Sequence, residues 1–104
     1  MEERVREELL EILRNNRGRW WLSLSLWPRL SDAARAYLEN RCGTAKGKRG
    51  GHRYGPITRI SQWLAVEARA GRGVERDYLD TRGLGVGKYK ASGRLSAIFR
   101  WIGP

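Results

Sequence analysis

Aromatic rings set between small polar residues are the side chains whose spacing first suggests chemistry in this sequence. Along RWWLSLSLW, residues 19–27, the pattern alternates as it does in a β-strand. Trp20 and the three leucines would face a core, and Trp21 and Trp27 would stand on the opposite face, about 20 Å apart. Because an exposed ring can stack on any unpaired base, the pattern favours a stacking platform for single-stranded nucleic acid.

Cationic side chains gather in two further segments. Residues 43–55 (GTAKGKRGGHRYG) hold five glycines and almost nothing to bury, which predicts a flexible basic loop. Residues 88–102 suggest a β-hairpin with Ser92-Gly93 at its turn. Bases in such segments can contact phosphates. The candidate nucleic-acid contacts are Lys46, Lys48, Arg49, Arg53, Tyr54, Arg59, Lys88, Tyr89, Lys90, Arg94 and Arg100.

The charge balance indicates a polyanionic partner. Of 104 residues, 21 are Lys or Arg and 11 are Asp or Glu, a net charge of +10. Five of the acids lie before Asn15, and the rest of the chain carries +12. Residues 40–66 and 81–104 contain no acid at all. A domain so far from neutral repels itself unless a polyanion compensates it, so nucleic acid is the expected partner.

Motifs for catalysis, metals and cofactors are missing from the sequence. The glycine-rich pieces lack GxxxxGK[ST], and GLGVG does not stand between a strand and a helix. His52 is the only histidine, which excludes a paired-histidine mechanism, and the single Cys42 has no partner at zinc-ligand spacing. We therefore expect a binding protein with no cofactor and no metal.

Helical periodicity defines the elements that position these side chains. Apolar residues at helical spacing predict helices at 2–15, 31–42 and 56–70, with Ser31 as an N-cap and Pro56 in a first turn. Residues 74–79 and 88–102 complete the β-structure. The expected fold is one α+β domain in the order α-β-α-α-β-β-β, with a small antiparallel sheet, including 20–27, that packs helices on one face.

The N-terminal helix and the hydropathy bear on partners and location. The helix carries its acids outward, which suggests a homodimer contact. No run of about 18 apolar residues is present, and no helix combines a basic face with a strongly apolar one, so no membrane association is expected. We therefore expect a cytoplasmic protein. Few Asn, Gln, Cys and Met residues are typical of a thermophile, although the arginine-rich composition fits a GC-rich genome equally well.

A strand, two helices and a run of strands ending in KYKASGRLSAIF, residues 88–99, resemble the general pattern of RelE-type messenger-RNA-cleaving toxins. The resemblance covers element order over 20–102. It implies a metal-free ribonuclease in which Arg, Lys and Tyr stabilise the developing charge. The chain departs from the pattern by its N-terminal helix, its long loop and the absence of a tail after the last strand.

Two other nucleic-acid functions remain open. A winged helix-turn-helix protein would use helices 31–42 and 56–70 with a wing at 88–102, although that motif joins its helices by three or four residues and thirteen intervene here. An assembly protein that becomes ordered against RNA fits the composition equally well. The expectation favoured by the exposed rings is low-specificity binding of single-stranded DNA or RNA.

Overall fold

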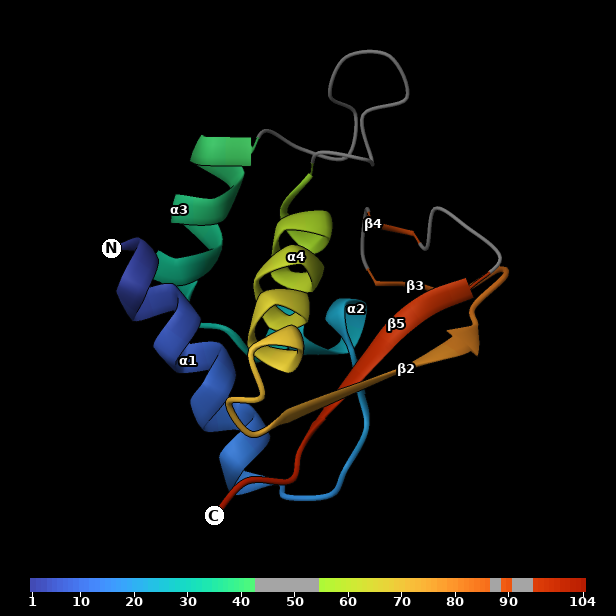
Figure 1. The fold of residues 1–104 in the computed structure, drawn as a ribbon. Helices are drawn as coiled ribbons and strands as arrows, with labels where there is room; N and C mark the ends of the chain where they lie inside the picture. The colour runs from blue at the N-terminus through green and yellow to red at the C-terminus, as the bar shows by residue number, and fades with distance from the viewer. Residues whose placement is uncertain (43–54, 87–88, 91–94) are drawn as a thin grey trace.

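The order of helices and strands along the chain matches the order that the sequence predicts, and the fold class is α+β (Figure 1). The computed structural model describes residues 1–42, 55–86, 89–90 and 95–104. The elements are α1 (Glu2–Asn15), β1 (Trp21–Leu22), α2 (Ser23–Leu26), the 3-10 helix η1 (Trp27–Arg29), α3 (Asp32–Cys42), α4 (Pro56–Arg69), β2 (Val74–Asp80), β3 (Gly85–Val86), β4 (Tyr89–Lys90) and β5 (Leu95–Trp101).

The three long helices confirm the helical predictions to within one residue at each end. Ser31 caps α3, because its Oγ accepts a hydrogen bond from the backbone N–H of Ala34 at 3.1 Å. The same hydroxyl donates to Glu8 of α1 at 2.8 Å, so the cap also joins two helices. Pro56 begins α4, where its missing N–H costs no hydrogen bond, and Gly71 follows the helix with φ +70°.

The predicted strand at 20–27 is wrong beyond its first residues. Only Trp21 and Leu22 are extended, and the chain then turns through α2 and η1. Alternation suits a strand with one buried face, but here residues on both faces are buried. Leu24 and Trp27 stand three residues apart in α2 and η1, where a helical turn brings both toward the core that Trp21 joins from β1.

The strand pairing also differs from the expected hairpin of 88–90 with 95–102. β5 lies in the middle of a three-stranded antiparallel sheet of order β1-β5-β2, whereas β4 pairs with β3 in a separate two-stranded sheet. β2 offers β5 a seven-residue ladder from Val74↔Trp101 to Asp80↔Leu95, and the two residues of β4 could satisfy far fewer backbone groups. The turn expected at Ser92-Gly93 lies outside the described residues.

Helices pack on one face of the three-stranded sheet, as predicted. Trp21, Val74, Phe99 and Trp101 share that face by register, and all four are buried in one core with the helices. The opposite face carries the ion pair between Arg100 and Glu75. In Figure 1, α4 lies between α3 and the paired strands β2 and β5, with α2 behind it. Among the elements that the structure describes, none covers the exposed side of α4 that carries Arg59 and Val66.

Candidate nucleic-acid interface

Trp21 and Trp27 do not form an exposed stacking platform, so that prediction is wrong. Their exposed fractions are 2% and 8%, and both belong to the core. The guanidinium groups of Arg19 and Arg29 lie 4.2 and 5.4 Å from the Trp21 ring centroid. Trp21 faces the core from β1, and Trp27 is turned inward because α2 and η1 replace the rest of the strand expected at 20–27.

Most of the predicted cationic contacts fall where the structure gives no side chain. Arg100 is described, and it is engaged within the fold: its Nε donates to Glu75, and its guanidinium lies 4.5 Å from the Trp20 ring centroid. Tyr89 and Lys90 are described only as the backbone of β4. The residues outside the described part are Lys46, Lys48, Arg49, Arg53, Tyr54, Lys88 and Arg94.

Arg59 is the predicted contact that the structure places on an open surface. It is exposed on α4, together with Gln62, Val66 and Arg69, and we call these four residues the α4 stripe. At about 100° per residue, positions 0, 3, 7 and 10 of a helix fall within an arc of about 80°. The inward positions Ile60, Trp63 and Leu64 are buried, which fixes the stripe on the solvent side. The four side chains therefore share one face.

No acid interrupts the α4 stripe, because the one acidic residue of α4 is turned inward. Glu67 has an exposed fraction of 9% and accepts a hydrogen bond from Arg72 at 2.7 Å. Arg6 of α1 approaches the same carboxylate at 3.5 Å. Among the described residues, Arg59 and Arg69 have no ion-pair partner, so their charges are available to an anionic ligand.

The contacts of Glu67 alter its protonation. The hydrogen bond from Arg72 lowers the pKa of Glu67 from its ordinary value of 4.5, and burial opposes that effect. The charges of Arg72 and Arg6 lower the pKa further. Glu67 is consequently an anion at neutral pH that holds α1, α4 and the turn before β2 together.

We expect Glu67→Gln to lower the free energy of unfolding by about 1–2 kcal/mol at pH 7, since it removes a charge-assisted hydrogen bond. A group whose folded pKa is depressed contributes stability above its unfolded pKa and loses it as the pH falls through the folded value. The difference between wild type and variant should therefore shrink below about pH 4. Urea unfolding at pH 7 and pH 3 measures it, with the exposed Glu11→Gln as control. An equal difference at both pH values would contradict the ionic role.

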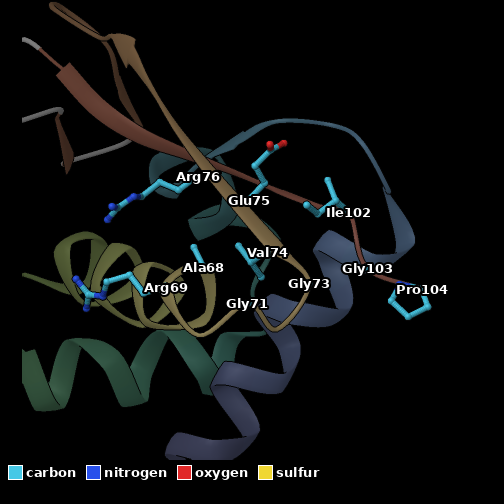
Figure 2. Close-up of a pocket in the computed structure, with 10 residues that line it drawn as sticks. All are labelled: Ala68, Arg69, Gly71, Gly73, Val74, Glu75, Arg76, Ile102, Gly103 and Pro104. Carbon is cyan, nitrogen blue, oxygen red and sulfur yellow. The ribbon is translucent and has the colours of Figure 1, made fainter.

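Arg76 of β2 extends the cationic surface beyond α4. Val74 and Arg76 are two residues apart and share the sheet face that packs against the helices. Val74 is buried, whereas Arg76 lies past the edge of the core and is exposed, 5.5 Å from the Tyr78 ring centroid. Figure 2 shows Arg69 and Arg76 pointing to the same side of a pocket between the end of α4 and the start of β2.

Three acids of α1 are exposed to solvent. These acids are Glu3, Glu7 and Glu11, and Glu7 is paired with Arg14 at 2.7 Å. None of the helices in the described residues is long and apolar enough to span a membrane. The same residues contain no group of three or more His, Cys, Asp or Glu side chains that could hold a metal ion.

Comparison of the chain with models of protein families, with curated proteins and with solved structures finds no match.

The α4 stripe could have been found from the sequence. Its signal is the complement of the apolar pattern: once Ile57, Ile60 and Leu64 are assigned to the core, positions 59, 62, 66 and 69 must face outward. Val66 is apolar and its residue type alone favours the core, but its exposed fraction is 40%. Its position therefore belongs to the outward face, which carries no acid.

Proposed function

We propose that this chain binds double-stranded DNA, with α4 in the major groove and the paired strands β2 and β5 beside it. The observation that carries the proposal is the α4 stripe, a solvent-facing row with an arginine at either end and no acid. An α-helix fits the major groove, where arginine and glutamine can contact phosphates and base edges. The role is binding without catalysis.

The arrangement of α3, α4 and the paired strands β2 and β5 supports duplex over single strands. A winged helix-turn-helix has two helices followed by an antiparallel wing, and here β2 and β5, which pair although β3 and β4 stand between them in the chain, take the place of the expected 88–102 hairpin. Residues 43–55 exceed the usual turn of that motif. Despite this longer connection, α3 and α4 contribute to the same core, which contains Leu38 of α3 and Ile60 and Leu64 of α4. The buried tryptophans remove the main argument for a single-strand preference.

Salt dependence tests the proposal on matched ligands. We expect a labelled duplex to bind more tightly than either of its strands, because only a duplex has the groove. With about four phosphate contacts, the log-log salt slope should be near −3.6, a loss of about 100-fold in affinity between 50 and 200 mM salt. Fluorescence anisotropy in EDTA measures both.

The same titrations distinguish the alternatives. Tighter binding of single-stranded DNA or RNA would contradict the proposal, as would a flat salt response. Metal-independent shortening of an RNA strand would point instead to the ribonuclease that the RelE-type resemblance implies. Sedimentation of the protein alone tests the homodimer that the outward acids of α1 suggest.

A further inference from the structure

The middle of the α4 stripe differs chemically from its ends. Gln62 and Val66 are uncharged and exposed, and they stand between Arg59 and Arg69. Neither residue adds to the attraction for phosphates, which depends on charge. An exposed β-branched side chain also gains nothing from solvent. This pair therefore calls for an explanation that the electrostatic part of the proposed function does not supply.

Spacing allows both residues to reach neighbouring base pairs. At a rise of 1.5 Å per residue, Gln62 lies about 4.5 Å along α4 from Arg59, and Val66 lies about 6 Å beyond Gln62. Base pairs of B-DNA are 3.4 Å apart along one strand. The two side chains also lie within about 40° of each other around the helix. A helix placed along the groove would present them to positions one or two base pairs apart.

The chemistry of the two side chains selects the same kind of base pair. In the major groove, the NH2 group of a glutamine amide can donate to N7 of adenine while its carbonyl oxygen accepts from N6. A G·C pair does not offer this bidentate match. An apolar side chain such as valine contacts the C5-methyl group of thymine. Arginine can contact either guanine or phosphate, and only the contact with guanine selects a base; we assign Arg59 and Arg69 to phosphates.

Resting on the proposed function, we propose that Gln62 and Val66 determine sequence specificity by reading A·T pairs in the major groove, with Gln62 on adenine and Val66 against a thymine methyl. The half-buried Thr58 and Ala65 flank the stripe with short side chains, which lets α4 approach the groove floor. Arg59 and Arg69 hold the ends of the helix on the duplex.

Selection from a pool of randomised duplexes tests this inference. We expect enriched sites to share A·T pairs, and exchange of one such pair for G·C to weaken wild-type binding about 10-fold or more. Gln62→Ala should bind both duplexes alike, because the variant has lost the group that discriminates. Asn15→Ala, which removes an exposed amide at the end of α1, is the matched control and should keep the preference.

Replacement of thymine by uracil isolates the role of Val66. Loss of the methyl group should weaken wild-type binding about 4-fold and leave Val66→Ala unaffected, given about 0.8 kcal/mol per buried methyl-sized group. Salt-dependent duplex binding without an enriched site, or a preference that survives Gln62→Ala, would overturn the inference while the proposed function stands. Absence of duplex binding would overturn both.

Discussion

Replacement of Trp21 by alanine is expected to lower the free energy of unfolding by about 3–5 kcal/mol. The ring is 2% exposed, stands opposite Phe99 of β5 in the sheet register, and is flanked by two arginines. Its removal leaves a cavity where β1 meets the core. Chemical denaturation followed by circular dichroism measures the loss.

Trp20→Ala provides the adjacent control. Trp20 is half-buried under Arg100, so its loss should cost less than half as much. If Trp21→Ala instead kept wild-type stability and lost affinity for single strands, the ring would be a stacking surface and its place in the core would be contradicted.

The second large effect concerns the charged ends of the α4 stripe. Arg59→Ala and Arg69→Ala should each weaken duplex binding about 10-fold, since a hydrogen bond to a charged group contributes about 1.5–3 kcal/mol. The double variant should lose about 100-fold and show a salt slope shallower by about two contacts, or ~1.8. Both residues are exposed, so the free energy of unfolding should change little.

Arg4→Ala controls for net charge in these measurements. Arg4 is exposed on α1 and its replacement removes the same unit of charge from a different surface. Anisotropy titrations at several salt concentrations compare the variants. Equal losses for Arg4→Ala and Arg59→Ala would show that net charge alone governs binding, without a specific role for α4.

Much of the helical framework is predictable from the sequence because each long helix carries an apolar stripe and a local boundary signal. Ser31 and Pro56 mark helix starts through interactions with their own backbone, which depend on neighbouring residues alone. The α+β class followed from these helices and the β-branched and aromatic segments after Val74.

Residues 20–27 and the partner of β5 were mispredicted because both depend on contacts distant in sequence. The alternation of RWWLSLSLW fits a strand with one buried face. Leu26 and Trp27 would lie on opposite faces of that strand, but both are buried in the core. Ser23 is buried as well, where its hydroxyl meets that of Ser61 on α4 at 2.6 Å. Likewise, β5 pairs across fourteen intervening residues with β2, a choice that no local signal encodes.

The candidate site was predicted only in part for a related reason. Arg59 was predicted from its charge, whereas Gln62 and Arg69 were not, because their importance comes from sharing the exposed face of α4 with Arg59. Arg100 was also predicted from its charge, but that charge is paired with Glu75 on the neighbouring strand β2. Counting bases along a sequence cannot separate paired from available charges.

Mapping the bound duplex onto the protein tests the central claim most directly. Amide chemical shifts of isotope-labelled protein are followed as unlabelled duplex DNA is added. If α4 enters the groove, the largest changes within the described residues should occur in α4, from 57 to 69, and in the exposed part of β2, with little change in α1. Changes concentrated in α1 or near the C-terminus, with α4 unaffected, would contradict it.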